Sequence, residues 1–104
     1  MKDINENFIK LEFTNGKDIT KEQLNDTLEN GNFIYIDLFD GHWVKNIYIP
    51  DEVPFSGGVI DIVSKAMYKT TIHVYDEQYV ISKGEELVIL GSPTKEWTVV
   101  VPKS

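Results

Sequence analysis

The stretch from Phe33 to Pro50 restricts the fold most, because hydrophobic residues alternate along it on both sides of a turn signal. Asp40-Gly41 readily takes the positive φ angles of a hairpin turn. Before this pair, Ile34, Ile36 and Leu38 fall on one side of an extended chain, and a mainly aromatic set falls on the other. We therefore predict a hairpin. Its first strand is packed on both faces, or has one face in the core and an aromatic stripe left for a partner.

The second strand of this predicted hairpin has a less regular pattern. Trp43, Ile47 and Ile49 share one face, which Lys45 interrupts. Among the aromatic residues of the chain, we expect Trp43 and Trp97 to be part of the core.

Short segments with strand character recur at intervals of about ten residues along the rest of the chain. They cover residues 8–13, 59–63, 70–75, 78–81, 87–90 and 97–101, with turns at Asp76-Glu77 and Lys83-Gly84-Glu85. The segment 59–63 has few polar breaks and is expected to be central. The pattern predicts a mainly β fold, a compact antiparallel sandwich or partly open barrel of seven to eight short strands.

One short helix is predicted near the N-terminus, from about Lys21 to Asn30. Thr20 and Gln23 match a capping box at its start. Leu24 and Leu28 form a narrow apolar stripe that can dock on the sheet, while the remaining side chains face water. The helix is therefore expected to cover the β-structure rather than to organise it.

The length of 104 residues suits one domain with one core, and we assign residues 1–104 to a single domain. The net charge is −7, from 10 basic and 17 acidic side chains. So acidic a chain is repelled at long range by phosphate backbones and by anionic lipid. We expect no nucleic-acid partner, no membrane insertion and a monomer.

The compartment is not fixed by the residues alone. No apolar run approaches the roughly 20 residues needed to cross a bilayer, and the first residues lack the apolar segment of a signal peptide. The chain is then either intracellular, or a mature fragment that begins with an added Met1. The absence of cysteine excludes disulfides and thiolate metal sites but is compatible with either location.

No catalytic constellation can be assembled from the sequence, and we predict no enzyme, no cofactor and no bound metal. His42 and His73 lie on different predicted strands without a third metal ligand, and no serine has a Gly-x-Ser-x-Gly context. One alternative is a calcium site, if Asp37, Asp40 and Asp51-Glu52 converge near the ends of the hairpin. Solvation and capping of turns is the simpler role for these acidic residues.

Aromatic residues exceed what a core of this size must bury, and Tyr and Trp combine an apolar ring with a polar tip. Some of them can form an exposed platform for a sugar or a protein partner, or can simply cover the sheet. The candidate binding residues come from the hairpin, from the loop after it and from residues 64–69, which form either a helical turn or a bend. They are Tyr35, His42, Tyr48, Asp51, Glu52 and Tyr68.

Three short elements in succession resemble a known family. They are Gly41-x-Trp43-Val44, Ile47-Tyr48-x-Pro50 and Ser64-x-Ala66-x-Tyr68, followed by a turn at Gly84 and by Trp97. This series resembles the small β-rich domain near the amino end of the secreted mucin-cleaving zinc metalloproteases of the StcE, TagA and dictomallein type. The resemblance extends over roughly residues 20 to 100.

The resemblance implies an accessory domain rather than the protease, because the His-Glu-x-x-His helix of that family has no counterpart here. It implies an extracellular, virulence-associated domain that contacts a glycoprotein, a cell-surface glycan or the catalytic domain of a larger protease. A second role stays open, that of a small acidic inhibitor or immunity-type protein whose negative face covers a basic partner.

Overall fold

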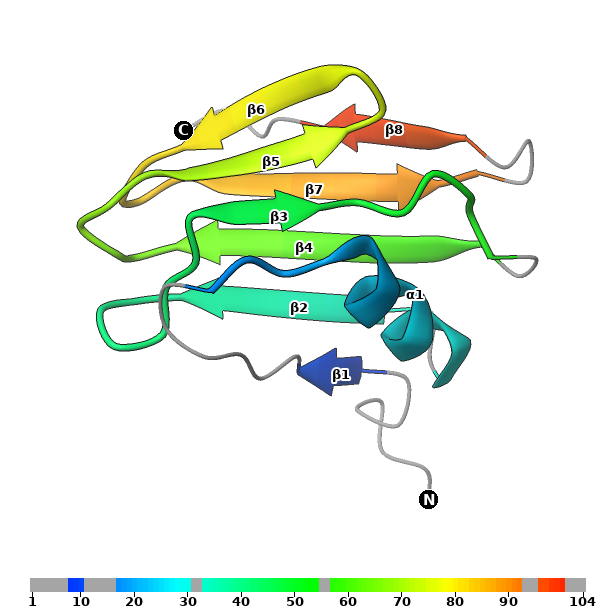
Figure 1. Ribbon diagram of the computed structural model, residues 1–104, viewed down its shortest axis with the longest axis horizontal. Coiled ribbons are helices and arrows are strands. Elements are labelled where there is room, and N and C mark those ends of the chain that lie inside the picture. Colours follow the sequence, from blue (N-terminus) through cyan, green and yellow to red (C-terminus); the bar gives the residue numbers. More distant parts are fainter. Residues whose placement is uncertain (1–7, 11–16, 31–32, 55–56, 93–95, 101–104) are drawn as a thin grey trace.

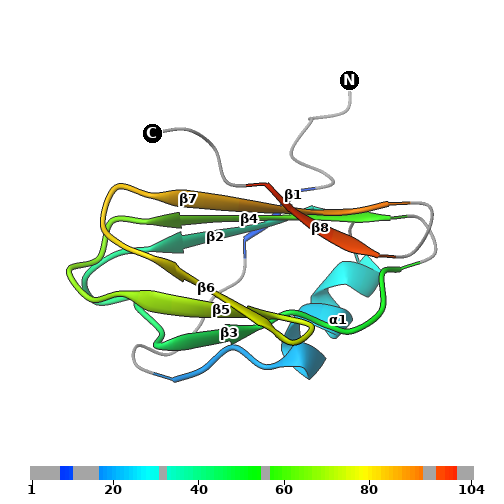
Figure 2. The same cartoon turned by 90° about the horizontal axis from the view of Figure 1, so that it is seen from above.

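The computed structural model describes residues 8–10, 17–30, 33–54, 57–92 and 96–100 and consists of two β-sheets that face each other, with one helix beside them (Figure 1, Figure 2). The mainly β sandwich predicted from the sequence is confirmed. In chain order the elements are β1 (Phe8–Lys10), α1 (Lys21–Asn30), β2 (Phe33–Leu38), β3 (Asn46–Tyr48), β4 (Gly58–Ser64), β5 (Thr70–Val74), β6 (Glu77–Ile81), β7 (Glu86–Gly91) and β8 (Trp97–Val100). Residues 11–13 and 101 of the predicted strands lie outside the described residues.

The larger sheet has the strand order β1-β2-β4-β7-β8. Strand β4 lies in its middle, between β2 and β7, which confirms the central position predicted for residues 59–63. The pairs β1·β2 and β2·β4 run parallel, whereas β4·β7 and β7·β8 run antiparallel. The sheet is thus mixed rather than antiparallel throughout, because the chain passes through the other sheet between β2 and β4.

The smaller sheet has the strand order β3-β5-β6, with β3 parallel to β5 and β5 antiparallel to β6. Ile19, just before α1, pairs with Ile47 along the outer edge of β3. The Ile19 amide donates to the Asn46 carbonyl at 3.0 Å, and the Tyr48 amide donates to the Ile19 carbonyl at 2.9 Å. This edge of the smaller sheet is therefore already paired at Ile19.

The predicted turn at Asp40-Gly41 forms, but the predicted hairpin is wrong. Phe39 and His42 exchange two backbone hydrogen bonds, of 3.1 and 2.8 Å, around Gly41 with its φ of 97°. Pairing stops there, and β2 and β3 lie in different sheets. In the register set by Phe39 and His42, a longer ladder would put Lys45 opposite the fully buried Ile36. An ammonium group on the core face would lose its hydration, so the chain crosses to the smaller sheet instead.

The core between the sheets consists almost wholly of aliphatic side chains. Every second residue of β2 and of β4 is buried, as expected for strands with one face inward. Trp97 is buried as predicted. Trp43, which was also predicted in the core, is only half-buried, because it stands at one end of the sandwich with its ring centroid 5.2 Å from that of Tyr68.

Helix α1 confirms the sequence prediction in extent and orientation. The Gln23 amide donates to the Thr20 hydroxyl at 3.2 Å, and the Thr20 amide donates to the Gln23 side-chain oxygen at 2.9 Å, which completes the capping box. Leu24 and Leu28 are both buried.

No helix in the described ranges is long and apolar enough to cross a membrane.

The turn between β5 and β6 lies one residue earlier than predicted, at Tyr75-Asp76, and Glu77 already belongs to β6. Tyr75 has a φ of 54°, a conformation that is unfavourable for a bulky residue. Its hydroxyl accepts a hydrogen bond of 2.8 Å from the Trp97 amide of β8. This bond links the turn to the larger sheet and helps to hold the strained residue in place.

Replacing Ile62 by alanine should lower the free energy of unfolding by about 2–5 kcal/mol, because the variant leaves a cavity in the middle of β4 between the two sheets. Urea denaturation followed by circular dichroism measures the change. The matched control is Val80→Ala on β6, whose side chain is 55% exposed and whose loss should change stability by less than about 0.5 kcal/mol. Equal losses for the two variants would contradict the assignment of the core.

Candidate functional site

The structure distributes the six predicted binding residues over four places. Tyr35 lies on the outer face of the larger sheet and Tyr48 on the outer face of the smaller sheet. Asp51 and Glu52 line a hollow beside α1. His42 and Tyr68 lie in loops at the opposite end of the sandwich.

The outer face of the smaller sheet, which we call the polar face, contains a stacked pair of rings and a chain of side-chain hydrogen bonds. Its residues are Asn46, Tyr48, Thr71, His73, Gln78 and the exposed Val80, which pairs with Thr71. The residues between them on β3 and β5, Ile47 and Ile72, point into the core. The rings of Tyr48 and His73, on directly paired positions of β3 and β5, stack with centroids 4.4 Å apart and planes at 12°. Two half-buried rings, one with a hydroxyl and one with ring nitrogens, thus stand side by side.

A chain of hydrogen bonds fixes the orientation of the His73 ring. The Asn46 amide nitrogen donates to the Asp18 carboxylate at 3.2 Å, so the Asn46 oxygen is left as an acceptor. This oxygen lies 2.9 Å from His73 Nε2, which must therefore carry a proton. In a neutral imidazole, Nδ1 is then the acceptor. The polar face accordingly has defined donors and acceptors beside its rings.

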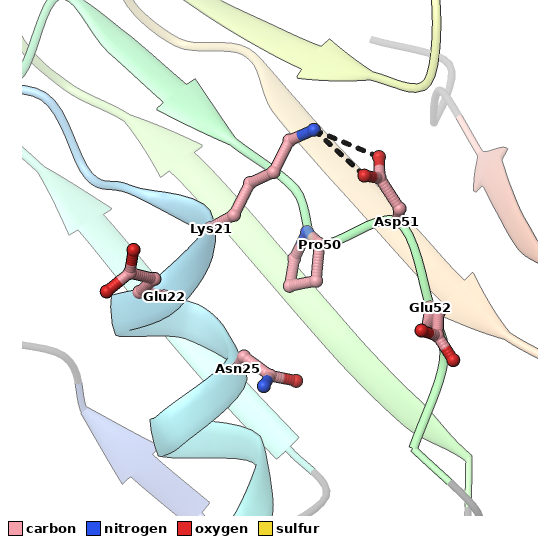
Figure 3. Close-up of a pocket in the computed structure, with 6 residues that line it drawn as sticks. All are labelled: Lys21, Glu22, Asn25, Pro50, Asp51 and Glu52. Atoms are coloured by element: carbon pink, nitrogen blue, oxygen red, sulfur yellow. Dashed lines mark hydrogen bonds and ion pairs between the residues drawn. The ribbon is translucent and has the colours of Figure 1, made fainter.

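The hollow beside α1 has a volume of about 230 Å³ and contains two of the predicted residues (Figure 3). It is lined by Lys21, Glu22, Asn25, Pro50, Asp51 and Glu52. Lys21 Nζ reaches across it to both carboxylate oxygens of Asp51, at 3.0 and 3.1 Å. Both side chains are largely exposed, so this ion pair adds at most about 1 kcal/mol to stability.

The structure contradicts the calcium site considered from the sequence, because the acidic residues do not converge. Asp37 and Asp40 lie at one end of the sandwich, whereas Asp51 and Glu52 lie beyond the opposite end of β3. The crossing of the chain between sheets separates the two pairs that a hairpin would have brought together. Among the residues that the structure describes, no group of three or more His, Asp or Glu side chains is placed to hold a metal ion.

The outer face of the larger sheet carries an ionisable pair that the sequence analysis missed. Asp61, in the middle of β4, faces Glu86 of β7 diagonally across the ladder and shares a hydrogen bond with it. Desolvation by burial, the hydrogen bond and the charge of Glu86 together raise the pKa of Asp61 to about 7. Burial and the charges of nearby carboxylates, including Asp61, also raise the pKa of Tyr35. The available signal was one acidic residue inside an otherwise aliphatic strand.

The raised pKa of Asp61 predicts that stability falls as the pH rises from about 4 to about 7, since the folded chain keeps a proton that the unfolded chain releases. Above about pH 7 this contribution is constant. Asp61→Asn should therefore flatten the decline in melting temperature between pH 5 and pH 8, measured by differential scanning calorimetry. Glu52→Gln, which changes an exposed carboxylate, should keep the wild-type profile. A profile for Asp61→Asn as steep as that of the wild type would contradict this assignment.

His73 and Asn46 are further residues that the sequence analysis did not include in a site. His73 was considered only as a metal ligand, and its strand was not expected to lie beside Tyr48. The parallel pairing of β3 with β5 brings Tyr48 and His73 together from 25 positions apart, which no local pattern reveals.

Comparison with known proteins relates the chain to one metalloprotease. Residues 31–100 match the family model described as the β-sandwich domain of metalloprotease StcE. Metalloprotease StcE of Escherichia coli O157:H7 is 28% identical over 71 residues, which are 68% of this chain and 8% of that protein. The chain therefore spans less than a tenth of the length of this relative.

Solved structures agree with this relation. The crystal structure of enterohemorrhagic E. coli StcE(132-251) superimposes with a TM-score of 0.64 at 26% identity, over 82% of this chain and 88% of the other. A structure described as a chaperone-substrate complex has a TM-score of 0.61 at 21% identity, over 88% of this chain and 18% of the other, and shares the fold. From the family match and the superposition on StcE(132-251), the chain belongs to the family of StcE β-sandwich domains.

Proposed function

We propose that this domain is a non-catalytic accessory module that binds glycoprotein through its polar face and works outside the cell. What supports an accessory role is membership in the StcE β-sandwich family together with the absence of a His-Glu-x-x-His segment from the sequence. The proteolytic activity of a metalloprotease would then belong to other parts of a larger protein. The domain would serve to hold or to orient its substrate.

The stacked rings of Tyr48 and His73 are the observation that carries the glycoprotein proposal. Sugars present an apolar C–H surface together with hydroxyl groups, and both aromatic rings and oriented hydrogen-bonding groups recognise them. The polar face offers both, because the Asp18–Asn46–His73 chain orients the imidazole beside the Tyr48 ring. Thr71 and Gln78 add a hydroxyl and an amide on the same face.

Tyr48→Ala should weaken binding to an immobilised mucin-type O-glycosylated protein by about tenfold or more, as expected for an aromatic hot spot. Biolayer interferometry with intact and enzymatically deglycosylated mucin measures the effect, and circular dichroism verifies the fold. Tyr35→Ala is the matched control, because Tyr35 is also half-buried on a β-strand but faces outward from the other sheet.

The possible outcomes show separately which sheet makes the contact and which part of the glycoprotein is recognised. Loss of binding with Tyr35→Ala instead of Tyr48→Ala would move the contact to the larger sheet. Equal binding to intact and deglycosylated mucin would show recognition of polypeptide. Undetectable binding of the wild-type domain to either form would refute the glycoprotein role.

A further inference from the structure

One end of the sandwich, which we call the loop end, consists of three loops held together by hydrogen bonds. It comprises residues 39–45, 65–69 and 82–85 (Figure 1, left). The Met67 amide donates to the Asp40 carboxylate at 3.1 Å, and the Gly84 amide donates to the Ser64 carbonyl at 2.7 Å. Such hydrogen bonds between loops restrain their backbone.

Two large apolar side chains project from the loop end into solvent. Met67 is 73% exposed and Tyr68 is 67% exposed, the two highest values among the large hydrophobic residues that the structure describes. Ala66, next to them, is fully buried and anchors the loop. The Tyr68 ring packs against the Trp43 ring, with their centroids 5.2 Å apart and their planes at 47°. A restrained loop that exposes neighbouring apolar side chains is typical of a docking surface.

Positive charge gathers around these side chains although the whole chain is acidic. The loop end contains Lys45, Lys65, Lys69 and Lys83, which are four of the six lysines in the described ranges that carry placed side chains. Lys65 lies 3.7 Å from the carboxylate of Asp37 but its side chain is mostly exposed.

The two acidic residues within the loop end are engaged in its internal hydrogen bonds. Asp40 accepts from the Met67 amide, and Glu85 accepts from the Ser82 amide at 2.6 Å. The described carboxylates that lie beyond the other ends of the strands, Asp51, Glu52, Asp76 and Glu96, are far from the loop end along the strand direction. The loop end therefore carries four lysines against two carboxylates. Asp18, Asp37 and Glu86 lie at the strand ends that adjoin it and reduce this excess of positive charge.

We infer that the loop end docks on an anionic phospholipid surface, with Met67 and Tyr68 entering the headgroup region. A convex apolar tip surrounded by lysines complements a flat and deformable interface with negative charge. The exposed thioether of Met67 has little to offer to the hydroxyl groups of a sugar, whereas burial in lipid removes its apolar surface from water. This inference is independent of the glycoprotein contact, which uses the polar face.

The net charge of −7 repels such a surface at long range, but salt confines that repulsion to short distances. The Debye length is about 8 Å at physiological ionic strength. The domain measures 36 × 35 × 28 Å, so carboxylates at the far ends of the strands lie several Debye lengths from a membrane that touches the loop end. Within contact distance, the four lysines of the loop end outnumber its two carboxylates, Asp40 and Glu85.

Partitioning into large unilamellar vesicles tests the inference, with vesicles of phosphatidylcholine alone and vesicles containing 30% phosphatidylserine. Co-sedimentation gives the partition coefficient, and a blue shift of Trp43 fluorescence reports contact at the loop end, since Trp97 is already buried. Met67→Ser with Tyr68→Ser should lower the partition coefficient at least about tenfold. Lys65→Gln and Lys69→Gln should each lower it about fivefold on the anionic vesicles.

Matched substitutions elsewhere serve as controls. Val80→Ser removes an exposed apolar side chain from β6, and Lys21→Gln removes a lysine from α1 at a distance from the loop end; both should leave partitioning unchanged. Absence of binding to the anionic vesicles would overturn the inference, as would equal losses for Lys21→Gln and Lys65→Gln. Binding to a sulfated polysaccharide without binding to vesicles would also overturn it and would assign the loop end to an anionic glycan.

Discussion

The aliphatic layer between the two sheets is the constraint on which the rest of the structure depends. Its side chains come from alternate positions of strands in both sheets, and nearly all of them are fully buried. A layer of this kind cannot accept a charged group, which explains why pairing after the Asp40-Gly41 turn ends before Lys45 and why the chain crosses over. That crossing determines which outer residues become neighbours.

The candidate surfaces follow from the same alternation, because a strand that turns one face to the core presents its other face to solvent. The smaller sheet exposes Tyr48 beside His73, and the larger sheet exposes Asp61 beside Glu86. The loops at one end add a third surface with a different character, apolar at its tip and positive around it. A domain of this size thus has separate surfaces for a sugar-bearing protein and for a lipid interface, as we propose.

Local features of the fold were readable from the sequence, and long-range ones were not. The capping box of α1, the buried pair Leu24 and Leu28, and the inward alternation of β2 depend on residues close together in the chain. The assignment of β2 and β3 to different sheets depends on what Lys45 would meet across a ladder, so the hairpin pattern alone was misleading.

In the candidate site, too, local features could be predicted from the sequence and long-range contacts could not. Tyr48 was found because an aromatic residue on a strand is a local signal, whereas its partner His73 belongs to a strand that the sequence does not place beside it. Trp43 was expected in the core because of its size, but its position at the end of the sandwich leaves part of its side chain exposed. Packing at the ends of sheets depends on loop geometry, which composition does not specify.

The order in which the chain visits the sheets has a consequence for folding. Strands β2, β3, β4 and β5 alternate between the larger and the smaller sheet, so both parallel pairs that they form, β2·β4 and β3·β5, enclose a strand of the opposite layer. Beyond the consecutive pairs β5·β6 and β7·β8, neither layer can be completed from neighbouring segments, because each of these two parallel contacts closes a loop that contains part of the other layer. We therefore expect the two layers to assemble in a single cooperative step, more slowly than a meander of equal size would.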